Sequence, residues 1–164
     1  MSVIAVSHIA IGVTDMERAL TFYRDVLGLR VDADWRQRLT EEQGRELHGG
    51  RAIDRRCVWL RWGEGEHQSA INLDELHTPT PVDRRADIYD LGVHHISLWV
   101  DDIDPIIERA RALGFPVIMP HVSDTAPYGE PPGGKIRSVF LRDADGNLIQ
   151  CDCRARSPNA GDRS

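Results

Sequence analysis

Branched apolar residues alternate with other residues along two short stretches that lie far apart in the chain. From His8 to Val13 they alternate with His8, Ala10 and Gly12, as in a β-strand that buries one face. Residues 95–100 repeat this alternation, and apolar residues at helical spacing follow each stretch. The pattern therefore predicts a strand followed by a helix at two places in the chain.

Both predicted helices carry sequence signals for a start and an end. Asp15 and Asp102 stand at the N-cap position or within a residue of it, where a side-chain oxygen accepts hydrogen bonds from free backbone N–H groups. Gly28 and Gly114 follow the last apolar positions, where a left-handed residue commonly ends a helix. We therefore expect the helices between these paired residues.

The parts that follow the helices also match each other, so the pattern is an internal repeat. Residues 56–61 match residues 137–142, and residues 70–74 match residues 148–152, in the same order in both halves. Each half therefore predicts strand, helix, strand, strand and strand, with the last two strands joined as a hairpin.

Loops of different length separate the matching parts, as tolerated insertions do. We expect the second strands at residues 31–35 and 117–119. A polar insertion at residues 36–51 has room for a short helix, and the Pro- and Gly-rich residues 121–135 predict a loop.

The repeat also suggests the organisation of the chain. We predict a first module at residues 1–76, a linker at 77–92, a second module at 93–153 and a polar tail at 154–164, all within one structural domain. Each module is too thin to enclose a pocket alone. Any site is therefore expected where the two modules meet, with one histidine from each.

Composition places the chain among ordinary globular proteins. Hydrophobic residues make up 41% and charged residues 28% of the 164 residues, which excludes collagen-like and wholly disordered chains. The net charge of −6 argues against nucleic acid as a partner, because phosphate neutralisation needs a basic excess. No stretch approaches the roughly 20 apolar residues of a spanning helix, and the start has no basic segment or cleavage site. We expect a cytoplasmic protein with no membrane partner.

Three cysteines, Cys57, Cys151 and Cys153, form neither a disulfide rhythm nor a C-x-x-C pair. Cys151 and Cys153 lie two positions apart on a predicted strand and so share one face. We expect all three to be reduced and buried.

The duplicated βαβββ pattern resembles the vicinal oxygen chelate superfamily, which includes glyoxalase I, extradiol dioxygenases and bleomycin resistance proteins. The match rests on the two histidine-containing strands, on the helix end at residues 22–29 and on the hairpin at residues 140–149, and it covers residues 4–153. The resemblance implies an α+β fold in which two βαβββ modules form an eight-stranded, cup-shaped sheet with helices on the convex side. It also implies a small-molecule ligand or substrate and a homodimer.

In that superfamily a divalent metal ion lies on the concave face, held by the first and fourth strands of each module. Carried over by position, the metal ligands here are His8 and Asn72 in the first module and His95 and Gln150 in the second. The resemblance thus implies Fe, Mn, Ni or Zn as the cofactor. The strand alternation points the same four side chains away from the apolar faces, and it places His94 on the face opposite His95.

The fourth strands depart from the metal-dependent relatives, which usually carry a glutamate where this chain has Asn72 or Gln150. Two histidines and two neutral amides leave the charge of a divalent ion uncompensated, so its affinity should suffer. A small register shift would make Asp152 an alternative third ligand and give the 2-His-1-carboxylate set of non-haem iron oxygenases. In the competing interpretation, the histidines and amides form a neutral hydrogen-bonded cluster without metal.

The missing glutamates also bear on chemistry. Gln150 cannot accept a proton at neutral pH, so isomerase chemistry of the glyoxalase or epimerase type lacks its expected base. Candidate catalytic groups in the second predicted loop are His121 and Tyr128, together with Glu130, and His48 is a further candidate from the first insertion.

Aromatic and basic residues on the predicted strands are candidates for substrate binding. The candidates are Trp59, Trp99, Phe140 and Arg61. Packing within the sheet is the competing role of the aromatic residues, and salt bridges near the hairpins are the competing role of Arg61 and its counterpart Arg142.

We therefore expect a metal-dependent small-molecule enzyme of the vicinal oxygen chelate type. Its chemistry would be dioxygenase-like or lyase-like, on an oxygen-chelating substrate, with aromatic compounds among the candidates. The alternative is a metal-free, drug-sequestering binding protein, which the loss of the glutamates and the acidic net charge also suit.

Overall fold

The computed structural model describes residues 3–43, 45, 49–65, 67–83, 86–131 and 133–155. The chain divides into two compact units, Met1–Arg84 and Arg85–Ser164. Each unit contains one four-stranded sheet and is described by itself.

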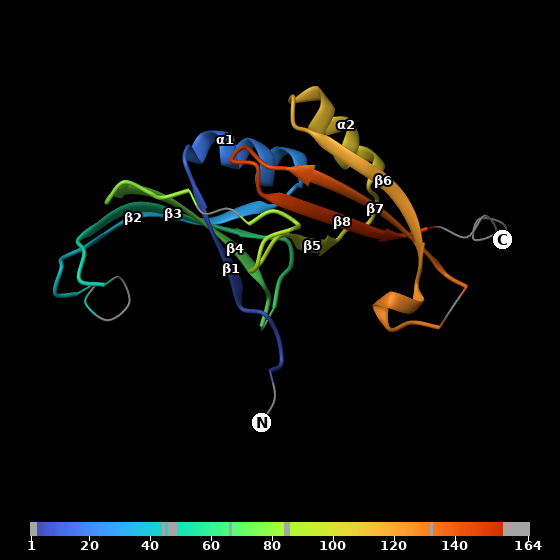
Figure 1. The fold of residues 1–164 in the computed structure, drawn as a ribbon, viewed down its shortest axis with the longest axis horizontal. Helices are drawn as coiled ribbons and strands as arrows, with labels where there is room; N and C mark the ends of the chain where they lie inside the picture. Colours follow the sequence, from blue (N-terminus) through green and yellow to red (C-terminus); the bar gives the residue numbers. More distant parts are fainter. Residues whose placement is uncertain are drawn as a thin grey trace. The chain divides into compact units, whose positions relative to one another are not determined.

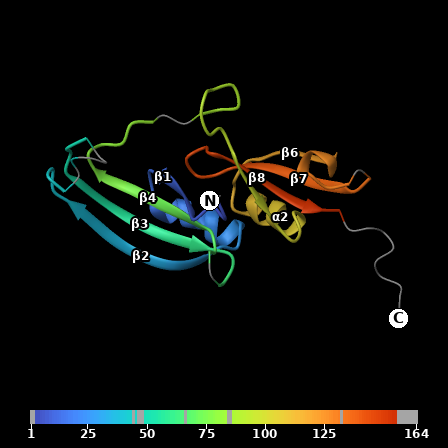
Figure 2. The same cartoon turned by 90° about the horizontal axis from the view of Figure 1, so that it is seen from below.

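The first unit follows the predicted order of elements. It consists of β1 (His8–Val13), α1 (Met16–Leu20), the π-helical segment η1 (Thr21–Val26), β2 (Arg30–Leu39), β3 (Ile53–Arg61) and β4 (Ala70–Thr78). The sheet order is β1-β4-β3-β2, with β1 parallel to β4 and the other pairs antiparallel. Figure 1 shows α1 on one face of this sheet, and Figure 2 shows β2, β3 and β4 side by side.

The second unit repeats this topology. It consists of β5 (Ile96–Trp99), α2 (Asp104–Ala112), β6 (Val117–Asp124), the 3-10 turn η2 (Ala126–Tyr128), β7 (Lys135–Arg142) and β8 (Leu148–Arg154). The sheet order is β5-β8-β7-β6, again with one parallel pair, β5 and β8. The predicted α+β class and the βαβββ repeat are confirmed.

The predicted helix signals act as expected. The Asp15 carboxylate accepts a hydrogen bond from the backbone N–H of Arg18 at 3.0 Å, and the Asp102 carboxylate accepts one from the backbone N–H of Asp104 at 3.1 Å. Gly28 and Gly114 have φ angles of +81° and +77°, in the left-handed region where glycine carries no Cβ penalty.

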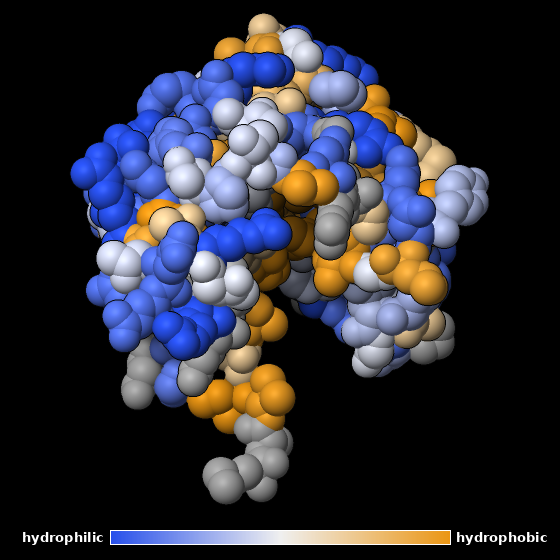
Figure 3. Space-filling view, turned by 60° about the vertical axis from the view of Figure 1, so that its left-hand side comes forward, coloured by the Kyte–Doolittle hydropathy of each residue, from blue (hydrophilic) through white to orange (hydrophobic). Residues whose placement is uncertain are grey.

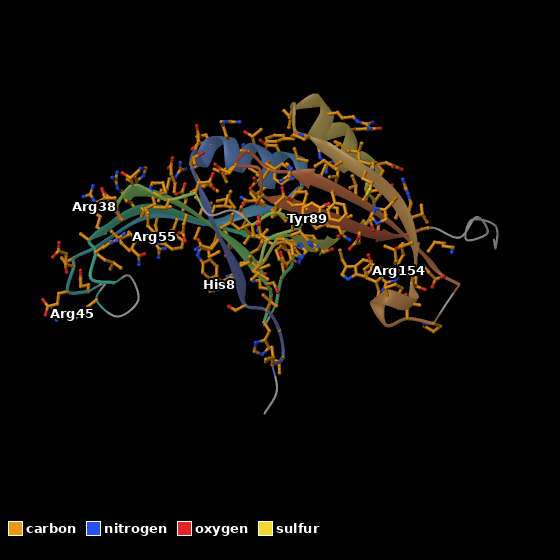
Figure 4. The ribbon with its side chains drawn as sticks, in the orientation of Figure 1. His8, Arg38, Arg45, Arg55, Tyr89 and Arg154 are labelled. Atoms are coloured by element: carbon orange, nitrogen blue, oxygen red, sulfur yellow. The ribbon has the colours of Figure 1, made fainter. Side chains whose placement is uncertain are left out.

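Each sheet buries the face that its helix covers. In the first unit the branched residues of β1 and the alternate residues of β3 and β4 are buried against the helical segments, which contribute Phe22 and Tyr23. In the second unit the corresponding buried residues of β7 and β8 include Val139, Leu141 and Ile149. We call the opposite face of each sheet its helix-free face, and Figure 4 shows His8 on that side of the first sheet, away from α1.

The expected lengths of the second strands and of the loops after them are wrong. β2 runs to Leu39 and β6 to Asp124, so both strands extend well into the predicted insertions. The predicted loop at residues 121–135 therefore begins as strand and contains η2. No helix occurs among the residues of the 36–51 insertion that the structure describes, and His48 lies outside the described residues, as does most of the predicted tail.

The three cysteines are free and buried, as predicted. Among the described residues, none of the helices has both the length and the apolar character needed to span a bilayer.

Candidate functional site

Register places the predicted site residues of the first unit on its helix-free face. Trp59 of β3 lies directly opposite Asn72 of β4, and Asn72 pairs in turn with Ala10 of β1. Residues that face each other across strands point to the same side of a sheet. His8, two residues before Ala10, therefore shares this face with Trp59 and Asn72.

An aromatic group forms around Trp59. Its ring centroid lies 5.0 Å from that of His8 and 6.4 Å from that of Trp35. The guanidinium of Arg61 lies over the Trp59 ring at 5.2 Å and also donates a hydrogen bond to Asp32 at 2.8 Å. Arg61 thus makes the salt bridge expected of it and at the same time covers part of an aromatic surface.

Asn72 is held by the acid two residues further along β4. Its side-chain N–H donates to Asp74 Oδ2 at 3.1 Å, and the Arg55 guanidinium donates to the same oxygen at 3.0 Å. Among the described residues, Oδ1 of Asn72, Oδ1 of Asp74 and the indole N–H of Trp59 are buried without a hydrogen-bond partner. Such groups cost free energy unless something else satisfies them.

His95 and His94 form a close pair at the start of the second sheet. Their Nδ1 atoms are 2.7 Å apart, and their rings are 4.6 Å apart. The expectation that the two side chains point to opposite faces is wrong, because β5 begins only at Ile96 and strand alternation does not yet apply to them. Burial, followed by the neighbouring His94, lowers the pKa of His95, while Asp152 acts in the opposite direction.

Phe140 of β7 lies between two histidines. Its ring is 5.8 Å from the His95 ring, edge to face, and 6.0 Å from the His121 ring, stacked at 15°. His121 belongs to β6 rather than to a loop, and it pairs with Ser138 after a register shift between Ile118 and His121. Ser138 lies two residues before Phe140 on β7, so both point to one face. His121 therefore shares the face of Phe140, and so does Ile118, which pairs with Phe140.

Gln150 and Asp152 of β8 repeat the arrangement of Asn72 and Asp74. The Gln150 side-chain N–H donates to Asp152 Oδ1 at 2.8 Å. The hydroxyl of Ser138 donates to the same oxygen at 2.5 Å, and that of Ser97 donates to Oδ2 at 2.5 Å. Asp152 is buried, and in the described part of the chain it forms no ion pair.

A second aromatic group lies at the end of β8. The Trp99 ring is 5.4 Å from the Tyr128 ring, and the Arg154 guanidinium lies over Trp99 at 4.7 Å. Arg154, labelled in Figure 4, is also paired with Glu130. The Tyr128 hydroxyl is 3.5 Å from the Gln150 side-chain nitrogen, which links this group to the Gln150–Asp152 pair.

The sequence did not identify every residue of these groups. Trp35, Ser97, Ser138 and Arg154 were missed, although strand alternation places Ser97 and Arg154 on the faces of His95 and Gln150. Arg142 is paired with Asp87 at 3.3 Å and donates to the Gly146 carbonyl, so its expected salt-bridge role is confirmed.

The residues can be compared with what a divalent ion needs, which is several convergent imidazole or anionic donors. In the described ranges no three side chains of His, Cys, Asp and Glu come together in such a group. Both amides direct their N–H groups to aspartates, and Asp152 already accepts three hydrogen bonds in a regular register. Within either unit, the residues present do not fit a bound divalent ion.

Comparisons with known proteins agree with the fold. Residues 5–151 match the family model described as Glyoxalase/Bleomycin resistance protein/Dioxygenase superfamily. A lactoylglutathione lyase of Haemophilus influenzae is 30% identical over 145 residues, which are 87% of each chain. A glyoxalase family protein from Bacillus cereus is similar in structure, with a TM-score of 0.75 at 22% identity, covering 95% of this chain and 97% of the other. An antibiotic binding protein from Streptomyces has a TM-score of 0.57 at 22% identity, covering 94% and 99%.

Proposed function

Since the chain belongs to the glyoxalase/bleomycin resistance protein/dioxygenase superfamily, we propose that it binds a planar small molecule on its helix-free faces without a resident metal ion. The observation that carries the proposal is the aromatic surface on the face that no helix covers. Trp35 and Trp99 are 39% and 51% exposed there, although large aromatic side chains normally bury most of their surface.

Polar groups accompany these rings, as in many ligand sites, where a mainly apolar surface carries a few polar groups that fix orientation. They are Asn72 in the first unit and Gln150 in the second, each held by an aspartate on the same strand. Arg61 and Arg154 cover the rings of Trp59 and Trp99 with planar guanidinium groups. A planar ligand offers the same kind of stacking contact.

Binding can be tested with 2-methoxynaphthalene, a planar probe, and with its saturated analogue 2-methoxydecalin. Isothermal titration calorimetry on the full chain should detect the planar probe and a weaker interaction with the saturated one. Trp59→Ala and Trp99→Ala should each weaken binding of the planar probe by about three- to tenfold, because stacking contributes about 0.5–1.5 kcal/mol.

Trp62→Ala is the matched control, because Trp62 is 50% exposed but belongs to neither aromatic group. It should leave the affinity unchanged. Equal affinity for the planar and saturated probes, or no effect of either test variant, would contradict the proposal.

A second candidate is a metal-dependent lyase with His8 and His95 among its metal ligands. It is favoured by the 30% identity to a lactoylglutathione lyase over most of both chains. The same fold carries different functions, so this likeness does not by itself define a reaction. Two further observations weigh against the candidate: both amide positions lack a carboxylate, and the N–H group of each amide is directed to an aspartate.

This candidate predicts turnover of lactoylglutathione by the full chain after loading with Ni²⁺ or Zn²⁺. The same preparation should then hold about one metal ion per site by elemental analysis, and His8→Ala or His95→Ala should remove it. Planar-probe binding that is unchanged by metal loading, with no turnover, would instead favour the metal-free binder.

A further inference from the structure

Both units contain the same local device, an amide followed two residues later on the same strand by an aspartate that it contacts. The device is Asn72 with Asp74 on β4 and Gln150 with Asp152 on β8. The separations between amide nitrogen and carboxylate oxygen are 3.1 Å and 2.8 Å. Because successive residues of a strand alternate between faces, each pair lies on a single face.

The contact fixes which end of each amide faces the acid and which end faces away from it. An ionised carboxylate only accepts hydrogen bonds, so the amide must turn its N–H group toward the aspartate. The opposite orientation would place an amide oxygen against a carboxylate oxygen. The carbonyl oxygen is therefore directed away from the acid.

The aspartates themselves are held in place. Asp152 accepts hydrogen bonds from Ser138 on β7 and Ser97 on β5, both at 2.5 Å, so three strands define its position. Asp74 accepts from Arg55 at 3.0 Å, and Arg55 is in turn bonded to Gln37 at 2.8 Å. Supports of this kind keep a polar group in one orientation.

The carbonyl oxygen of Asn72, which faces away from Asp74, lacks a hydrogen-bond partner among the described residues. Asn72 is only 8% exposed, and its Oδ1 is buried without a hydrogen bond to any described residue. Across the strand, the indole N–H of Trp59 is likewise buried and unpartnered. A ligand that supplies a hydrogen-bond donor to such a buried acceptor binds with a more favourable free energy.

We propose that Asp74 and Asp152 are positioning residues that orient the carbonyl oxygens of Asn72 and Gln150 for a ligand, so that each helix-free face selects planar molecules bearing an N–H or O–H donor. This inference rests on the proposed planar-ligand function and adds the chemical class of the ligand. Aspartate acts here through the amide and not by contact with the ligand.

The test compares 2-naphthol with 2-methoxynaphthalene, which share a ring system and differ in the O–H donor. Calorimetry on the full wild-type chain should show about five- to tenfold tighter binding of 2-naphthol, the value of one neutral hydrogen bond. In the double variant Asn72→Leu, Gln150→Met, this preference should disappear, while 2-methoxynaphthalene still binds.

The positioning role is tested by Asp74→Asn and Asp152→Asn, combined in one chain. An asparagine can offer either an oxygen or an N–H group, so the neighbouring amide is no longer held in one orientation. The preference for 2-naphthol should fall to about twofold or less, with the affinity for 2-methoxynaphthalene nearly unchanged. A purely structural role of the acids would lower both affinities together and would overturn the positioning role.

Asp104→Asn is the control, because it makes the same kind of substitution once on α2, where Asp104 pairs with Arg137 away from the helix-free face. It should keep the full preference. If the aspartate variants fail to fold, the preference in wild type and its loss in the amide double variant decide the ligand class. Equal binding of the two probes to wild type overturns this inference and leaves the proposed function standing, whereas no binding of either probe overturns both.

Discussion

At the scale of single residues, burial decides which groups of this protein can react. Cys57 and Cys151 are almost fully buried, and the pKa of each thiol is raised to about 12, chiefly by loss of solvation. Neighbouring Asp74 contributes to this rise for Cys57, and neighbouring Asp152 contributes to it for Cys151. The acids that orient the amides thus also keep the adjacent thiols protonated.

We predict that the cysteines do not react in the folded protein. At pH 7 a thiol with a pKa of about 12 is thiolate in only about one molecule in 10⁵, and the thiolate is the reactive form. A dithiobis(nitrobenzoate) assay should show almost no thiol release from the native chain and release from all three cysteines in concentrated guanidinium chloride. Rapid modification of one thiol under native conditions would contradict this.

At the scale of elements, the bulge in β6 determines what the second helix-free face contains. His121 is three residues after Ile118, so an uninterrupted strand would turn the two to opposite faces. The register shift between them puts both on one face and stacks His121 on Phe140. Met119 within the shift has a φ of +44°, a left-handed conformation that costs a non-glycine residue free energy.

We predict that Met119→Asn stabilises the protein, because asparagine tolerates the left-handed region better than methionine does. The free energy of unfolding in urea should rise by about 0.5–1 kcal/mol. The Met119 side chain is 63% exposed, so little packing is lost. Val122→Asn is the control, since Val122 is equally exposed in the same strand but has no left-handed backbone, and it should not stabilise.

The elements and the faces of their residues could be predicted from the sequence wherever apolar residues recur at regular strand or helix spacing. Alternation by two placed His8, Asn72 and Gln150 correctly on faces away from the helices, because that property is local. The bulge at Met119 and the π-helical η1 change the period itself, and neither has a local pattern of apolar residues to reveal it. Pro120 within the observed β6 is the only hint, because proline in a strand favours a bulge.

The contacts that orient the site were beyond sequence reasoning for a different reason. The three hydrogen bonds on Asp152 come from β5, β7 and β8, which are distant in the chain. Whether Ser97 and Ser138 meet that carboxylate depends on the register of two strand pairs. A single sequence shows which residues of a strand share a face, but it does not show which residue of the neighbouring strand lies opposite each of them.

At the scale of the whole molecule, duplication has preserved the topology and allowed the charges to diverge. Asp74 in the first unit is paired with Arg55, whereas Asp152 in the second unit is surrounded by neutral donors in the described residues. The same amide–acid device therefore has a neutralised acid in one unit and an uncompensated one in the other. A planar ligand with a positive charge should for this reason prefer the second unit.

The segment before β1 bears on the assembly of the molecule. Val3, Ile4 and Val6 are 91%, 75% and 56% exposed, and Figure 3 shows hydrophobic side chains at this end of the chain. Exposed aliphatic side chains that cluster within four residues are typical of surfaces at which protein chains associate. We predict that the protein is a homodimer in solution and that this segment contributes to its interface.

Sedimentation equilibrium should therefore give twice the mass of 18.5 kDa for the wild-type chain. Each buried aliphatic side chain contributes on the order of 1 kcal/mol, and the triple variant Val3→Ser, Ile4→Ser, Val6→Ser removes three from each protomer, so it should raise the dimer Kd by about 10⁴-fold. Val122→Ser, which removes a valine that is 63% exposed on β6, should leave the dimer intact. A monomer at every concentration would refute the dimer, and a triple variant with unchanged Kd would place its interface elsewhere.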